Sequence, residues 1–174
     1  MSDHISNIKV EFIEQSILRM DEYLVKIEKC LDELDEKDIW LRPNKSSNSI
    51  GNLVLHLCGN ITQYIMSGLG NEKDLRERDE EFNAMGGIPK SELYNKLHIV
   101  VKEANEEIRN LDLDALQTIR SVQGFSLSGI GIVFHVVEHF SYHTGQIAFW
   151  TKMLKDIDLG FYSDLDLNQK NLPD

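Results

Sequence analysis

Cysteine and proline are both scarce in this sequence, which contains two cysteines and three prolines among 174 residues. Cys30 and Cys58 lie in stretches of helical periodicity and do not form a CxxC pair, so we expect two reduced, packed thiols rather than a disulfide framework. No histidine lies three or four residues from Cys58, where it could activate the thiol. The two cysteines are therefore poor candidates for a nucleophile.

Basic residues are in deficit as well, because 18 Lys and Arg face 29 Asp and Glu and leave a formal net charge of −11. An acidic surface repels phosphate backbones and anionic lipids, so we expect no nucleic acid and no membrane among the partners. No apolar run reaches the roughly 18 residues of a membrane-spanning helix, and the residues after Met1 do not form the basic and apolar regions of a signal peptide. These features predict a cytoplasmic protein.

Four long stretches repeat apolar residues with the period of a helix, over about 6–35, 50–69, 91–111 and 128–154. The alternation typical of a strand never persists outside them, so the sequence predicts an all-α protein with no strand. We expect residues 1–174 to form one four-helix-bundle domain, in which residues 155–174 are a surface tail.

The segments between the helices indicate how the helices begin and connect. About twenty residues, from Asn71 to Pro89, separate the second and third helices and predict a crossover rather than a tight hairpin. Residues 44–49 supply N-cap side chains for the second helix, and Ser91 or a residue beside it is the expected N-cap of the third. The fourth helix is apolar almost all round, which predicts a central position, and Gly145 within it is expected to permit close packing.

Three histidines, His135, His139 and His143, recur every four residues on this fourth helix and so face nearly one way. A second polar stripe, Asn52, His56 and Asn60, has the same spacing on the second helix. Each buried imidazole without a hydrogen-bond partner would lower the stability of the fold by about 1 to 3 kcal/mol. We therefore favour a shared metal ion over three isolated core histidines.

Two histidines of the stripe could join His56 to provide three neutral nitrogen ligands, which leave coordination positions free, as in catalytic metal sites. Helical geometry alone does not select His139 and His143 over His135 and His139. The stripe continues through Gln146 toward the C-terminus, which favours His139 and His143 as ligands and Gln146 as a residue that supports a ligand.

An alternative motif overlaps this stripe, because the five residues from His135 to His139 match the HxxEH pattern of some zinc peptidases, with Glu138 as the general base. The pattern is short, and peptidases of that type need a much larger chain to enclose a peptide. Glu138 also lies about 100° around the helix from His139, so we expect it to face away from a metal.

Three segments together resemble the DinB-like superfamily of metal-binding four-helix bundles, most of all a branch described as a domain of unknown function. They are residues 40–60 with the motif NLVLHLCGN, residues 76–82 (RERDEEF) and residues 135–146 with the motif HFSYHTGQ. The resemblance implies an up-down-down-up bundle, often dimeric, with a long crossover between helices two and three. It implies a divalent ion (Zn, Ni, Fe or Mn) held by His56, His139 and His143, with His135 and Asn60 in supporting positions.

Members of this superfamily have been described as metal-dependent hydrolases, and some relatives transfer a low-molecular-weight thiol to an electrophile. The resemblance therefore implies an enzyme that acts on a small molecule, as a thiol S-transferase or a hydrolase. The alternative is a metal-binding or stress-associated interaction protein without catalysis. In the crossover, Arg76 and Arg78 could bind a carboxylate or phosphate of the substrate, or they could belong to a solvated charge cluster.

Overall fold

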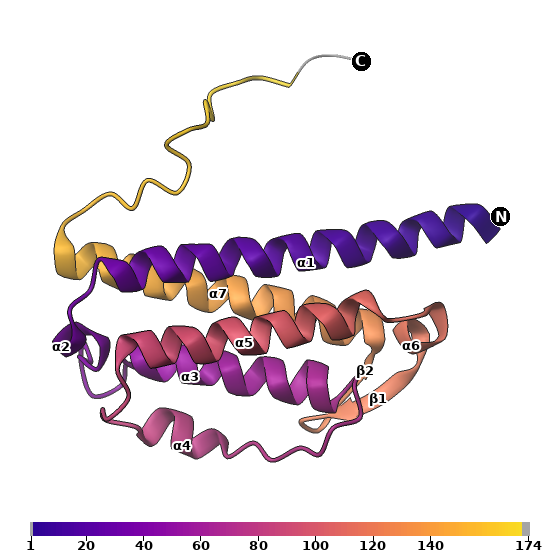
Figure 1. The fold of residues 1–174 in the computed structure, drawn as a ribbon, viewed down its shortest axis with the longest axis horizontal. Helices are drawn as coiled ribbons and strands as arrows, with labels where there is room; N and C mark the ends of the chain where they lie inside the picture. The colour runs from indigo at the N-terminus through magenta and orange to yellow at the C-terminus, as the bar shows by residue number, and fades with distance from the viewer. Residues whose placement is uncertain (1, 172–174) are drawn as a thin grey trace.

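The structure, a computed structural model, describes residues 2–171 and consists mainly of helices (Figure 1). The helices are α1 (Ser2–Asp32), α2 (Glu36–Ile39), α3 (Ile50–Ile61), the π-helix η1 (Thr62–Ser67), α4 (Arg78–Asn83), α5 (Lys90–Arg109), α6 (Leu113–Gln117) and α7 (Gly129–Lys155). The strands β1 (Ile119–Val122) and β2 (Phe125–Ser128) precede α7. The last three residues of the expected tail and Met1 lie outside the described residues.

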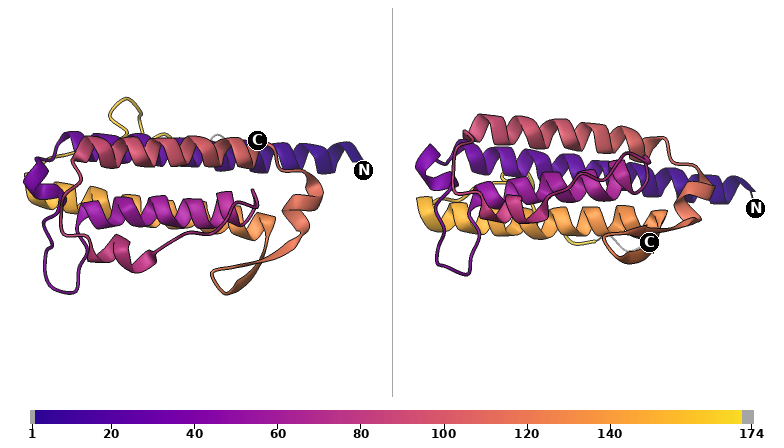
Figure 2. Two further views of the ribbon diagram at one scale, coloured as in Figure 1. Left: turned by 60° about the horizontal axis from the view of Figure 1, so that its bottom comes forward. Right: turned by 90° about the horizontal axis from the view of Figure 1, so that it is seen from below.

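Four long helices, α1, α3 continued by η1, α5 and α7, lie side by side (Figures 1 and 2). α1 and α7 run in one direction, and α3 and α5 run in the other. The ammonium group of Lys90, at the start of α5, donates to the carbonyl oxygens of Leu31 and Leu34 at 3.0 and 2.7 Å, which fixes that start beside the end of α1. The expected up-down-down-up course is confirmed.

The inward faces of these helices share one hydrophobic core, and fully buried side chains come from each of them. Met20, Leu57, Leu97 and Phe140 are examples from α1, α3, α5 and α7. The expectation that α7 is central was wrong, because Phe134 and Phe149 are 65% and 66% exposed. α7 packs on α1 and α3 with one face and leaves an apolar face uncovered.

The crossover between the second and third long helices is confirmed, and residues 78–83 within it form α4, which packs along α3 (Figure 1). The buried side-chain amide of Asn52 donates to the carbonyl oxygens of Glu81 and Ala84 at 2.9 and 2.8 Å. Arg42 donates to the carbonyl oxygen of Phe82. Two side chains from the start of the second helix and the loop before it thus hold the crossover against the bundle.

The hairpin β1–β2 corrects the expectation that the chain forms no strand. The strands pair antiparallel, from Ile119 opposite Ser128 to Val122 opposite Phe125. Gln123 and Gly124 both have positive φ, 51° and 81°, as the tight two-residue hairpin turn requires. Four residues per strand are too few for alternation to stand out from the flanking helical windows.

The helix starts were partly predicted. Ser49 caps α3 as expected, since its hydroxyl accepts the N–H of Asn52 at 3.1 Å. The expected cap at Ser91 or its neighbour was wrong: Pro89 precedes the first residue of α5, and the N–H of Lys90 donates to the carboxylate of Glu36. A carboxylate distant in sequence thus replaces a local capping side chain.

The tail leaves α7 at Asp156, which has a φ of 52°. It forms no helix over its described residues, but Leu159 is 3% exposed and belongs to the core. Lys26 of α1 donates to the hydroxyl of Tyr162 at 2.6 Å. Among the helices of residues 2–171, we find none long and apolar enough to cross a membrane.

Candidate metal centre

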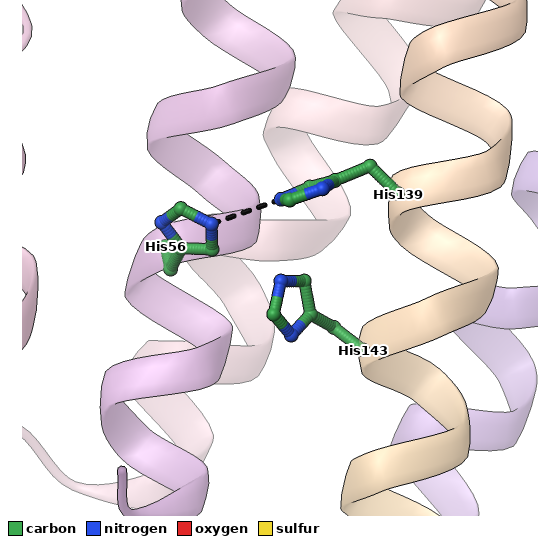
Figure 3. Close-up of side chains that lie close together, drawn as sticks. All are labelled: His56, His139 and His143. Carbon is green, nitrogen blue, oxygen red and sulfur yellow. Dashed lines mark hydrogen bonds between the residues drawn. The ribbon is translucent and has the colours of Figure 1, made fainter. Parts of the chain in front are cut away.

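Three imidazole rings converge between α3 and α7 (Figure 3). His56 comes from α3, and His139 and His143 come from successive turns of α7. One nitrogen of each ring lies within 4.8 Å of the others, and the Nε2 atoms of His56 and His139 are 2.9 Å apart. These three residues could therefore hold one metal ion.

The sequence places these rings together by helical geometry. His139 and His143 are four residues apart and so lie on one face of α7, and α7 packs against α3. His56 occupies the matching face of α3 and is 5% exposed. The three-residue group excludes His135, which the spacing alone had left as an equal partner of His139.

A buried carboxylate supports His56. Oε2 of Glu81 lies 2.9 Å from Nδ1 of His56. Arg76 holds both oxygens of this carboxylate, with Nε 2.7 Å from Oε1 and Nη2 2.8 Å from Oε2, and the two side chains are 4% and 10% exposed. Burial opposes ionisation of Glu81, but the hydrogen bonds from Arg76 and His56 outweigh it and hold its pKa below the usual value.

This contact selects the tautomer of His56. Nη2 of Arg76 also lies 3.1 Å from Nδ1 of His56, but an unprotonated Nδ1 that accepted from it would place two lone pairs against each other, its own and that of the Glu81 oxygen 2.9 Å away. A carboxylate can only accept, so the Nδ1 proton of His56 is directed at Glu81. The lone pair of Nε2 then faces the other two histidines, which is the usual arrangement of a metal-binding histidine.

Gln146 supports His143 in a similar way. Its amide oxygen lies 2.7 Å from Nδ1 of His143 and accepts that proton, which leaves Nε2 as the basic nitrogen. Burial lowers the pKa of His143 to about 4. Burial, with repulsion by the neighbouring histidines, lowers the pKa of His139 to about 3. Both rings are therefore neutral at pH 7, in the form that binds a metal ion.

His135 and Asn60 lie one turn away and contact each other rather than joining the three rings. The amide nitrogen of Asn60 is 3.4 Å from Nε2 of His135. The ring of His135 stacks between those of Tyr64 and His139, at centroid distances of 4.2 and 5.4 Å. Oδ1 of Asn60 is buried and has no hydrogen-bond partner in the part of the chain that the structure describes. Glu138 is exposed, so the HxxEH residues do not assemble a metal site with a base.

The two crossover arginines have different environments. Arg76 is buried against Glu81, so it does not belong to a solvated charge cluster. Arg78 is exposed, and its guanidinium carbon lies 4.7 Å from the ring centroid of Phe82. The ring of Phe82 in turn lies 4.7 Å from that of His56.

Glu81 is the residue of the site that the sequence does not single out, since it stands among other acidic residues in the segment 76–82. Its local spacing carries no metal-ligand pattern. The available signal was indirect: a buried His56 needs an acceptor for its Nδ1 proton, and the crossover supplies both a carboxylate and an arginine to neutralise it.

The remaining predictions from the sequence concern Gly145 and the cysteines. A Cβ atom added at Gly145 would meet nothing within 4 Å, so the expected close packing there was wrong. Cys30 and Cys58 are buried free thiols, as expected. Burial raises the pKa of Cys30 to about 11 and that of Cys58 to about 12.

Comparisons with known proteins identify a family and support the fold. A family model described as "Protein of unknown function (DUF1572)" matches residues 7–163. A DinB-like protein from Bacillus cereus ATCC 10987 superposes with a TM-score of 0.65 at 15% identity, over 81% of this chain and 91% of that one. A DinB-like protein from Bacillus subtilis superposes with a TM-score of 0.66 at 14% identity, over 85% of this chain and 96% of that one.

At such identities these two structures establish the fold alone, and no curated protein matches the sequence. The family match covers most of the chain, and the two solved structures share the helical architecture of this protein. The chain therefore belongs to the DUF1572 family of proteins of unknown function and has a DinB-like fold.

Proposed function

We propose that this protein is a metal-dependent enzyme that acts on a small molecule, with His56, His139 and His143 as the ligands of one divalent ion. The observation that carries the proposal is the convergence of three imidazole nitrogens from two helices within 4.8 Å. Three neutral nitrogen ligands are typical of catalytic metal sites, because they leave a position for water or substrate.

The residues present fit a divalent transition metal. Imidazole nitrogens suit zinc, nickel and iron better than magnesium or calcium, which prefer oxygen ligands. Glu81 and Gln146 each accept an Nδ1 proton and thereby direct an Nε2 lone pair inward. That the bound ion is Zn, Ni, Fe or Mn stays a prediction.

A bound divalent ion with a free position would supply Lewis-acid chemistry, with water or a thiol as the nucleophile. Glu81 and Gln146 orient two of the ligands, and burial keeps His139 and His143 neutral. Cys30 and Cys58 cannot serve as the thiol, because both are buried and their pKa values are raised. A thiol substrate would therefore be a small molecule from solution.

For an anionic electrophile, exposed Arg78 is the available partner, since Arg76 is occupied by Glu81.

Metal analysis of purified variants tests the ligand set. We expect His56→Ala, His139→Ala and His143→Ala to abolish stoichiometric metal binding, and His135→Ala to retain it. Retention by all of the first three variants would overturn the proposal. Loss with His135→Ala and His139→Ala alone would instead favour the HxxEH interpretation.

Turnover assays test the enzymatic part of the proposal. The metal-loaded protein is incubated with a panel of small electrophiles and esters, with and without low-molecular-weight thiols. Metal-dependent thiol consumption would identify a transferase, and thiol-independent cleavage would identify a hydrolase. No turnover across the panel would favour the alternative of a non-catalytic metal-binding or interaction protein.

A further inference from the structure

Gly59 lies three residues after His56 on α3, and side chains of the crossover pack directly against it. A Cβ atom added at Gly59 would lie 1.9 Å from Oε1 of Glu81, 2.8 Å from its Cδ and 2.9 Å from Nε of Arg76. The Glu81 carboxylate thus occupies the space that any other residue at position 59 would need for its side chain.

We propose that Gly59 is a positioning residue of the candidate metal centre, because the space beside its Cα allows Glu81 to reach Nδ1 of His56. This inference rests on the proposed function for its effect on metal affinity. The contact itself is present without a metal ion: Oε2 of Glu81 is 2.9 Å from Nδ1 of His56, while Oε1 faces Gly59 and Nε of Arg76.

The fold should tolerate a methyl group at Gly59. The atoms that it would meet are the ends of two flexible side chains, not backbone. The crossover backbone is held separately, by hydrogen bonds from Asn52 to the carbonyl oxygens of Glu81 and Ala84. Alanine also favours a helix more than glycine does. Gly59→Ala should therefore disturb the contacts of the Glu81 and Arg76 side chains and leave the backbone of α3 and of the crossover in place.

Other glycines provide a contrast and a control. A Cβ atom at Gly68 would lie 2.4 Å from the carbonyl oxygen of Tyr64, so substitution there would strain the backbone. A Cβ atom at Gly145 would meet nothing within 4 Å, although Gly145 lies two residues from His143. Gly145→Ala is therefore a matched control, made in a helix close to the same site.

A double-mutant cycle tests the coupling. Cobalt(II) affinity is measured by competition with a chelator for wild type, Gly59→Ala, Glu81→Ala and the double variant, with Gly145→Ala as control. We expect each of the two single variants to bind cobalt about 10- to 100-fold more weakly. The double variant should match Glu81→Ala, because the carboxylate that the methyl group displaces is already absent. Wild-type affinity in Gly59→Ala, or fully additive losses, would overturn the inference.

Folding is controlled in two ways. Circular dichroism and thermal denaturation of each variant show whether a loss of affinity reflects a loss of structure. Because Glu81→Ala leaves the buried Arg76 without its partner, Glu81→Asp provides a second background. The shorter carboxylate makes room for a Cβ atom, so Gly59→Ala should weaken cobalt binding less in this background than in wild type.

A measurement without metal separates this inference from the proposed function. Nitrogen-15 NMR of the histidine rings reports which nitrogen of His56 carries the proton. We expect the Nδ1–H tautomer in the metal-free wild type and in Gly145→Ala, and its partial loss in Gly59→Ala. An unchanged tautomer in Gly59→Ala would contradict the positioning role. A wild type that binds no metal would overturn the proposed function but leave this comparison decisive.

Discussion

At the scale of single residues, the candidate site depends on which nitrogen of each imidazole carries its proton. Two of the three rings have an acceptor at Nδ1, Glu81 for His56 and Gln146 for His143. The spacing of the histidines and the position of Gln146 could be read from one helix. The position of Glu81 beside His56 could not be predicted in this way, because it depends on how the crossover folds back over α3.

Removal of the acceptor at His143 should weaken metal binding. In Gln146→Ala, Nδ1 of His143 loses the amide oxygen 2.7 Å away, so its tautomer and ring orientation are no longer fixed. We expect a loss of affinity for zinc of about 10- to 100-fold, measured by chelator competition. Gln117→Ala, at an exposed position of α6, should bind zinc like wild type. Equal affinity in all three proteins would contradict the role of Gln146.

The two thiols should be inert in the folded protein. Both are buried, and their pKa values are raised to about 11 for Cys30 and about 12 for Cys58, so almost no thiolate is present at pH 8. A chromogenic disulfide reagent should titrate two thiols per chain only after denaturation. Rapid reaction of either thiol in the native protein would contradict the burial of Cys30 and Cys58.

At the scale of elements, the crossover is the part that sequence analysis described least completely. Its length was evident from the gap in periodicity between 71 and 89, and the four long helices were evident from their apolar spacing. The contacts that hold the crossover against the bundle could not be predicted, because they come from side chains distant in sequence, such as Asn52 and Arg42. The hairpin was also missed, because its four-residue strands are too short to show a period of two.

Asn52 should matter for stability, because its side chain ties the crossover to α3. It is fully buried, its side-chain oxygen accepts the N–H of Ser49, and its amide nitrogen donates to the carbonyl oxygens of Glu81 and Ala84. Asn52→Ala leaves buried carbonyl groups without a donor, so we expect a loss of about 1 to 3 kcal/mol in the free energy of unfolding. Urea denaturation measures this loss. Asn110→Ala removes an exposed amide and should change stability little; equal losses in both variants would contradict the account.

At the scale of the whole molecule, the metal-free protein should lose stability as the pH falls. The pKa values of His139 and His143 are about 3 and 4 in the fold and 6.5 in the reference state, so the unfolded chain takes up protons first. Their contribution is fully present above about pH 6.5 and is lost as the pH falls toward 4 and then 3.

Urea denaturation of metal-free protein between pH 7.5 and 5 measures this dependence. The range lies above the usual pKa of carboxylates, so histidines dominate it. In His139→Ala the free energy of unfolding should change less steeply with pH than in wild type. Identical slopes in the two proteins would contradict the lowered pKa of His139.

The assembly state is a second property at this scale. α7 leaves large apolar side chains exposed, among them Phe134, Phe149 and Met153, although its sequence predicts a central helix. The homodimer that the family resemblance implies stays a prediction, and sedimentation velocity measures it. We expect twice the mass of the chain, and a monomer at all concentrations would contradict it.

A crystal structure of the protein grown with zinc and measured at the zinc absorption edge would show directly whether the three histidines bind one ion. We expect one anomalous peak within bonding distance, about 2.0 to 2.1 Å, of nitrogens from His56, His139 and His143. A peak on other residues, or none between α3 and α7 in a zinc-saturated crystal, would contradict this expectation.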